Sequence, residues 1–188
     1  MGHKDRVSAS GSQALSDEMK QTSVREHKAQ APPSVRCVVI TVSDSRTEDS
    51  DTGGRAIVEL LEAAGHVVAS RTIVRDDPEA VRGTIERQLA NPNVQVIITT
   101  GGTGITSRDS TYEAVSQLLQ KKLDGFGELF RMLSYEQIGS AAMMSRATAG
   151  LVAGHIVISL PGSEPAVRLA MERLLIPELG HLVQQATR

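Results

Sequence analysis

The segment best suited to chemistry is a glycine-rich loop, Thr99-Thr-Gly-Gly-Thr-Gly104, which Arg108-Asp109 follows closely. Glycines in such a loop let backbone N–H groups approach an anion closely. A buried β-branched run precedes the loop and a helix is predicted to follow it, so the helix dipole also favours a bound phosphate. We therefore predict a phosphate-binding loop made of Thr100, Gly101, Gly102, Thr103 and Gly104, the two threonines adding hydroxyl donors.

The loop matches neither of two familiar nucleotide-binding patterns. A Walker A motif needs a second glycine where Thr106 stands, and the dinucleotide-binding glycine pattern fails at Ser107. Glycine-rich turns also occur for purely structural reasons, so the glycines alone leave both interpretations open.

Asp109 favours a functional interpretation of the loop. An acid beside a phosphate-binding loop would repel the ligand unless a cation lay between them, which suggests phosphates bridged by Mg²⁺. The alternative is that Asp109 caps the helix that begins near Ser110, since aspartate is a preferred capping residue. We also read Ser110-Thr-Tyr-Glu113 as a capping box.

A second pair of acids, Asp76-Asp77, ends another predicted strand. Asp77 precedes Pro78, a pattern typical of a helix cap. We assign Asp76 to the site instead, as a metal ligand or proton acceptor. Asp76 and Asp109 are thus the predicted catalytic and Mg²⁺-binding residues.

Three further segments are candidates for binding the substrate. Ser43-Asp44 begins a polar loop that could line a pocket, or could be an ordinary connector with Asp51 or Thr52 capping the next helix. Ser145-Arg146 brings a guanidinium that suits phosphate or carboxylate, unless it is only a surface charge. Pro161-Gly162-Ser163 forms a turn whose N–H groups could bind a ring or a phosphate, or simply join a strand to a helix.

Hydrophobic periodicity predicts the elements that must position these residues. Short β-branched runs predict strands at 36–42, 67–74, 94–100 and 155–160. Helical spacing predicts helices at 53–64, 78–90, 111–121, 128–138, 140–148, 164–175 and 177–187, with a break at 125–127. This alternation predicts a mostly parallel sheet with helices on both faces. Ligands of such sheets bind outside the carboxyl ends of the strands, where the segments 43–51, 101–109 and 161–163 become neighbours.

The chain divides into residues 1–34, polar and expected to be a flexible tail, and residues 35–188, the expected α/β domain. A net charge of −2 and a pI near 6.2 argue against nucleic-acid binding. A single cysteine, Cys37, excludes a disulfide framework and a cysteine zinc site, and it fits a cytoplasmic location. We expect neither a membrane span nor a secretory signal, because no long apolar run occurs.

Taken in order, the motifs resemble those of the MoaB/MogA family, whose eukaryotic relative is the gephyrin G domain. The GFGExFR stretch and the Ile138-Gly-Ser140 that follows are closest to the MoaB branch. Some relatives have proline where this chain has Tyr112. The resemblance rests on eight segments, Val42–Ser45, Asp51–Gly54, Thr99–Gly104, Arg108-Asp109, Gly125–Glu128, Phe130–Ser134, Ser145–Ala147 and Leu160–Ser163.

The resemblance implies a three-layer α/β/α fold and a homotrimer or homohexamer. It implies molybdopterin as the ligand and adenylylation of molybdopterin by Mg-ATP, giving adenylyl-molybdopterin and pyrophosphate. Asp76 and Asp109 match two functionally important acids of the family, and Ser145, Arg146 and Gly162-Ser163 match segments that line the pterin pocket. A molybdate-insertion protein would be a partner for the following step.

Two other functions stay open at this stage. A non-catalytic carrier or scaffold would bind molybdopterin and pass it on, and it need not bind Mg-ATP. A phosphate-binding α/β domain with another small substrate is a third possibility, because one fold hosts many functions.

Overall fold

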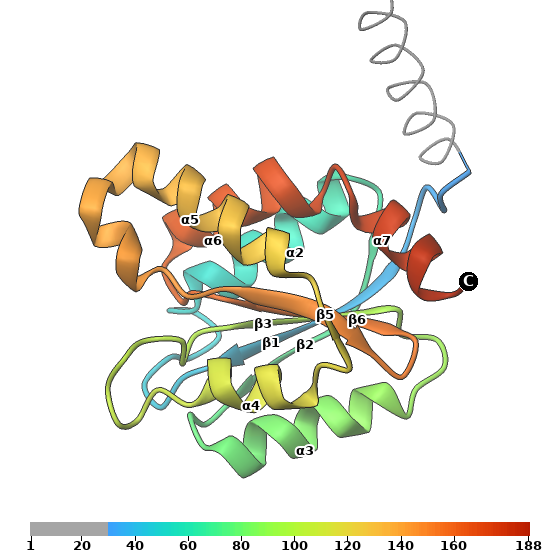
Figure 1. Cartoon of the computed structure of the whole chain (residues 1–188). Helices are drawn as coiled ribbons and strands as arrows, with labels where there is room; N and C mark the ends of the chain where they lie inside the picture. The colour runs from blue at the N-terminus through green and yellow to red at the C-terminus, as the bar shows by residue number, and fades with distance from the viewer. Residues whose placement is uncertain (1–29) are drawn as a thin grey trace, which may run out of the picture. The chain divides into compact units, whose positions relative to one another are not determined.

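A six-stranded sheet with strand order β2-β1-β3-β6-β5-β4 organises the protein in the computed structural model (Figure 1). The structure describes residues 30–188, so most of the predicted tail lies outside the described residues. β2, β1, β3 and β6 run parallel, whereas β5 and β4 are antiparallel to their neighbours. The strands are β1 Arg36–Val42, β2 Val67–Val74, β3 Val96–Thr100, β4 Lys121–Lys122, β5 Thr148–Val152 and β6 His155–Leu160.

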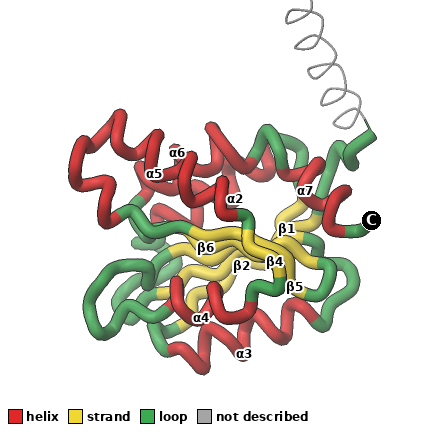
Figure 2. Tube along the Cα trace, in the orientation of Figure 1, coloured by secondary structure: helices red, strands yellow, loops and turns green. Residues whose placement is uncertain are grey.

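Helices cover both faces of the sheet (Figures 1 and 2), which confirms the predicted three-layer α/β/α architecture. One face carries α2 (Thr52–Ala63), α5 (Asp124–Ile138), α6 (Glu164–Ala170) and α7 (Leu179–Ala186). The other face carries α3 (Pro78–Leu89) and α4 (Thr111–Leu118). A 3₁₀ segment, η1 (Gly139–Met144), follows α5, and a π-helical turn, η2 (Met171–Leu175), continues α6. Within residues 30–188, no helix is long and apolar enough to cross a bilayer.

The period-2 alternation of the strands divides the core between the two faces. Val38, Ile40 and Ile97 pack with Val81 of α3 and Val115 of α4. On the other face, the intervening strand residues Val39, Ile98 and Ile158 pack with Ile57 of α2 and Leu175 of η2. Cys37 is buried among them, as predicted.

Two predicted helix caps are confirmed. Asp51 accepts a hydrogen bond from the Gly54 N–H at 2.9 Å, and Asp77 accepts one from the Ala80 N–H at 2.8 Å. Each cap fixes the start of the helix that leads away from the carboxyl edge of the sheet.

Two sequence predictions are wrong in the region of α5 and β5. The predicted break at 125–127 lies inside α5, because a helix tolerates glycine when packing compensates. The predicted helix 140–148 ends at Met144, and Thr148 begins β5 instead. β5 and β6 form a hairpin whose two turn residues, Ala153 and Gly154, both have positive φ, and pairing with β6 makes this segment a strand.

Candidate active site

The glycine loop lies at the carboxyl end of β3, between the ends of β1 and β6. The Gly101 N–H donates to the Leu160 carbonyl at 3.1 Å, and Gly101 and Gly102 have φ of +99° and +62°. A Cβ atom on Gly101 would overlap the Val42 carbonyl oxygen. A Cβ on Gly102 would lie 2.8 Å from Asp76 Oδ1, too close for a normal contact. Only glycine therefore allows the loop backbone to approach this carboxylate so closely.

Asp76 lies beside the loop, where it was predicted to be. Its backbone N–H donates to Asp44 Oδ1 at 3.2 Å, and its carboxylate accepts from the Ser110 hydroxyl at 3.4 Å. Partial burial raises the pKa of Asp76, and the negative charges of Asp109 and Asp44 raise it further, while the Ser110 hydrogen bonds oppose the shift. Burial is thus the main cause of the raised pKa, and the nearby charges of Asp109 and Asp44 add a repulsion that a bound cation would offset.

Asp109 faces the other end of the loop. Its Oδ2 accepts from the Thr106 backbone N–H at 2.9 Å and from the Thr106 hydroxyl at 2.6 Å. A Cβ atom on Gly104 would lie 2.5 Å from the same oxygen. The hydrogen bond from the Thr106 hydroxyl lowers the pKa of Asp109. The capping alternative is wrong, because Ser110 occupies the N-cap position of α4.

The predicted capping box is wrong as well. Ser110 makes no side-chain capping hydrogen bond, because its hydroxyl points to Asp76. The Glu113 carboxylate accepts from Arg146 instead, and this hydrogen bond lowers the pKa of Glu113. The side chains of Ser110 and Glu113 thus bond to residues of the site and not to the backbone of the first turn of α4.

Arg146 holds the glycine loop. Its Nε donates to the Thr103 carbonyl at 2.8 Å, one Nη donates to the Gly104 carbonyl, and the other donates to Glu113. The guanidinium carbon lies 4.7 Å from the centre of the Tyr112 ring, within cation–π range. The structure therefore gives Arg146 a role in shaping the loop. Ser145 lies half-buried at the end of η1.

Ser43 and Asp44 organise the end of β1. The Ser43 hydroxyl accepts from the backbone N–H groups of Ser45 at 3.3 Å and Arg46 at 3.1 Å, closing a turn. Asp44 is exposed and reaches the backbone of Asp76, as described above. The two residues thus connect the loop after β1 to the loop after β2.

A buried ion-pair network, not predicted from the sequence, supports the same edge. The Asp51 carboxylate is fully buried and accepts from the Thr41 hydroxyl at 2.7 Å. Arg46 Nη1 lies 3.5 Å from Asp51 Oδ1, and Arg71 Nε lies 3.4 Å from Asp51 Oδ2. Arg46 Nη2 also donates to the Gly162 carbonyl at 2.6 Å. The network therefore joins the loop after β1 to the turn after β6.

The turn after β6 packs directly on the glycine loop. A Cβ atom on Gly162 would lie 3.2 Å from Gly101 Cα, and Thr100 donates its hydroxyl proton to the Pro161 carbonyl at 2.8 Å. Ser163 occupies the N-cap position of α6 and is exposed. The fold thus brings together the predicted segments at 43–44, 76, 100–109, 145–146 and 161–163.

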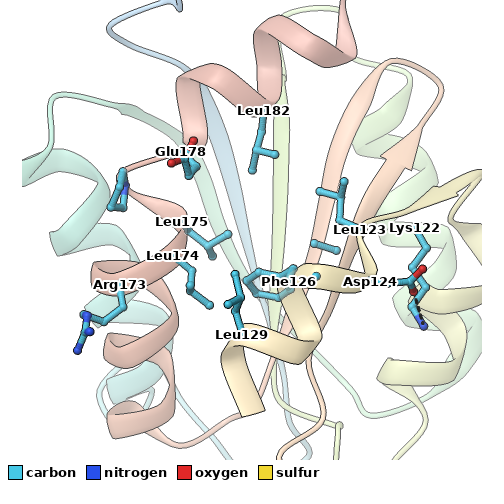
Figure 3. A pocket seen from close by; sticks show the side chains of 13 residues that line it. Lys122, Leu123, Asp124, Phe126, Leu129, Arg173, Leu174, Leu175, Glu178 and Leu182 are labelled. Carbon is cyan, nitrogen blue, oxygen red and sulfur yellow. Dashed lines mark ion pairs between the residues drawn. The ribbon is translucent and has the colours of Figure 1, made fainter. Parts of the chain in front are cut away.

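A hollow lies away from the candidate site. It has a volume of about 620 Å³ and separates the first turn of α5 from η2 and α7, as Figure 3 shows. Leucine and phenylalanine side chains line it, and the Lys122–Asp124 ion pair lies at its rim. None of the predicted site residues contributes to this hollow.

Comparison with known proteins identifies the family. The model described as "Probable molybdopterin binding domain" matches residues 38–181. The chain belongs to this family. Molybdenum cofactor biosynthesis protein B of Bacillus anthracis is 53% identical to it over 167 residues, which cover 88% of this chain and 99% of that protein.

Solved structures agree with this assignment. A crystal structure of Molybdenum cofactor biosynthesis protein B has a TM-score of 0.81 and 52% identity, covering 84% of this chain and 98% of that one. The tungsten cofactor synthesizing protein MoaB from Pyrococcus furiosus has a TM-score of 0.76 and 38% identity, covering 84% and 100%. The resemblance to the MoaB/MogA family is confirmed, and these relationships support a part in molybdenum cofactor biosynthesis.

Proposed function

We propose that this protein binds molybdopterin and adenylylates it with Mg-ATP. One observation carries the proposal: the carboxylates of Asp76 and Asp109 lie against Gly102 and Gly104, within about 3 Å of where a Cβ would stand. The loop offers N–H groups to phosphate, and the two acids would repel that phosphate unless a cation joined them. This is the arrangement expected where two phosphorylated substrates react.

The reaction is a transfer of the adenylyl group. An oxygen of the terminal phosphate of molybdopterin attacks the α-phosphorus of ATP and forms a new P–O bond. The bond between the α-phosphorus and its bridging oxygen breaks, and pyrophosphate leaves with the electron pair. Gly101–Gly104 would orient the attacking phosphate, so the protein's main contribution is positioning.

The residues of the site fit Mg²⁺ that arrives with ATP. In residues 30–188 no group of three or more His, Cys, Asp or Glu side chains is arranged to hold a metal. Mg²⁺ needs only one or two protein carboxylates when phosphates and water supply its other ligands. Asp76 and Asp109 would hold it, and it would neutralise charge on the phosphates. The Thr111 hydroxyl is buried beside Gly102 without a hydrogen-bond partner, and it is a further donor for a ligand.

The surface of α5 and η1 supports self-association, and we propose a homotrimer or homohexamer. Six large apolar side chains are exposed on these two elements, although such residues usually avoid water in a monomer. Sedimentation velocity would show a monomer if the proposal were wrong. The exposed residues are Leu129, Met132, Tyr135, Ile138, Met143 and Met144.

Turnover by matched variants tests the proposed activity. Asp109→Asn and Asp76→Asn keep the size of each side chain but remove its charge, and both should retain the fold and molybdopterin binding while losing formation of adenylyl-molybdopterin. Asp49→Asn, on an exposed side chain, is the control and should be fully active. Full activity of both site variants would refute the roles given to the two acids. Tight molybdopterin binding without product from the wild type would establish the carrier function instead.

A further inference from the structure

α4 is held less firmly than α3, the other helix on its face of the sheet (Figure 1). It has 8 residues against 12, and its buried residues are Thr111 and Val115. The Asp77 side chain caps α3, whereas α4 begins without a side-chain capping hydrogen bond. A short helix depends on packing and capping for its stability, so we expect α4 to open locally more often than α3.

The surface beneath α4 weakens its packing further. α4 packs on β5 and β6, and Ser159 of β6 faces the same side of the sheet as Val157, which belongs to the core cluster of Val115. Ser159 pairs with Thr148 of β5. In the described part of the chain, the hydroxyls of Ser159, Thr148 and Ser116 of α4 are buried without a hydrogen-bond partner. Each such hydroxyl costs free energy, so a small shift of α4 costs less than a shift of a well-packed helix.

The first turn of α4 contains both halves of an unused capping box. In this motif the Ser110 hydroxyl accepts from the Glu113 N–H, and the Glu113 carboxylate accepts from the Ser110 N–H. In the structure both side chains bond elsewhere: the Ser110 hydroxyl donates to Asp76 at 3.4 Å, and the Glu113 carboxylate accepts from Arg146. Each half of the box is therefore held open by one charged residue of the candidate site.

The two residues that hold the box open carry the charges that a metal-bound phosphate would engage. A divalent cation competes with the Ser110 hydroxyl for the Asp76 carboxylate, and a phosphate competes with Glu113 for the Arg146 guanidinium. Both existing bonds are replaceable. The distance of 3.4 Å between Ser110 and Asp76 is long for a hydrogen bond between two oxygens, and the Glu113 side chain is 51% exposed to water.

We propose that α4 is a two-state element that responds to a metal-bound phosphate, an inference that rests on the proposed function. The cation frees Ser110, the phosphate frees Glu113, and the two freed side chains close the capping box. Ser110 has ψ of −9°, whereas Asp77, which does cap a helix, has ψ of 126°. Closing the box therefore turns the chain at Ser110 and shifts the adjacent Asp109 relative to α4. Occupancy of the site is thereby coupled to the position of Asp109.

Hydrogen exchange at the Glu113 amide, followed by NMR, measures closure of the box. Saturating Mg-ATP should slow this amide about fivefold, the typical effect of a helix cap. ATP with EDTA should leave it unchanged, because no cation then displaces Ser110 from Asp76. The Ala80 amide, which Asp77 already caps, is the internal control and should exchange at the same rate throughout.

Asp76→Ala tests the same switch without a ligand. Removing the carboxylate frees Ser110, so the Glu113 amide should exchange about fivefold more slowly than in the wild type without ligand. Adding Ser110→Ala should remove this protection, because alanine cannot cap the helix. Asp49→Ala, which removes an exposed acid in the loop after β1, is the matched control and should exchange like the wild type.

Three results would overturn the proposal. They are a Glu113 amide that Asp76→Ala leaves unprotected, protection that persists after Ser110→Ala is added, and Mg-ATP that binds to the wild type without slowing this amide. If Mg-ATP does not bind at all, the proposed function fails, and Asp76→Ala then decides alone whether the box closes. Loss of adenylylation with an intact response of α4 would contradict the proposed function and leave this inference standing.

Discussion

Replacing Asp51 by asparagine should destabilise the protein far more than the same change at another helix cap. Asp51 and Asp77 both cap helices through one backbone N–H, at 2.9 and 2.8 Å. Asparagine caps as well as aspartate does, so Asp77→Asn should cost at most about 0.5 kcal/mol. Asp51 is fully buried and also faces Arg46 and Arg71, so Asp51→Asn leaves two guanidinium groups without their carboxylate.

The expected cost follows from those contacts. Losing one member of a buried ion pair costs about 3–5 kcal/mol, and one hydrogen bond to a charged group about 1.5–3 kcal/mol. The side chains of Arg46 and Arg71 are 28% and 23% exposed, so water compensates for part of the loss. We expect about 2–4 kcal/mol, which for a domain of this size lowers Tm by about 5–15 °C.

Thermal and urea unfolding of the two variants measure this difference directly. The reasoning predicts a clear gap between Asp51→Asn and Asp77→Asn, with equal m-values. Equal stability of the two variants would show that the arginines do not depend on Asp51, and the network would then not hold the Gly162 turn in place.

Three more predictions concern single side chains. Burial raises the pKa of Cys37 to about 12, so its thiol should not react with Ellman's reagent at pH 8 until the protein is unfolded; rapid labelling of the native protein would contradict its burial. Because the pKa of Asp76 is raised, its ionised form disfavours the folded state, so the stability that Asp76 itself contributes is fully present below about pH 3.8 and is lost as pH rises through the folded pKa. Asp76→Asn should therefore raise Tm at pH 7 and lose that gain in acid, and a lower Tm at pH 7 would refute this. Arg146→Lys should lower turnover about tenfold, because lysine cannot reproduce the forked contact with the loop, and unchanged turnover would make that contact dispensable.

The sequence predicted the strongly patterned parts of the fold well. β1 and β2 have the predicted bounds, because both runs are rich in β-branched residues; β1 is buried, whereas β2 at the edge of the sheet is only partly covered. β5 could not be predicted, because Thr148-Ala-Gly carries little β propensity and becomes a strand by pairing with β6. The glycines at the start of α5 predicted a loop because glycine has a low helix propensity, whereas tertiary packing makes this segment helical.

The sequence predicted the position of the site at the carboxyl ends of the strands, but not the contacts that shape it. Asp76 and Asp109 follow the parallel strands β2 and β3, and parallel topology brings such positions to the same edge of the sheet. The role of Arg146 in holding the loop could not be predicted, since its partners are carbonyl groups more than forty residues away. The Asp51 network depends likewise on Arg71 from β2, which only the folded sheet places beside it.

The measurement that tests the central claim most directly is the fate of labelled ATP. Purified protein would be incubated with molybdopterin, Mg²⁺ and ATP labelled either at the α-phosphorus or at the γ-phosphorus. The account predicts that the α-label appears in a molybdopterin product and the γ-label in pyrophosphate, in equal amounts. The γ-label in the pterin product, or no transfer by protein that binds molybdopterin tightly, would contradict adenylylation.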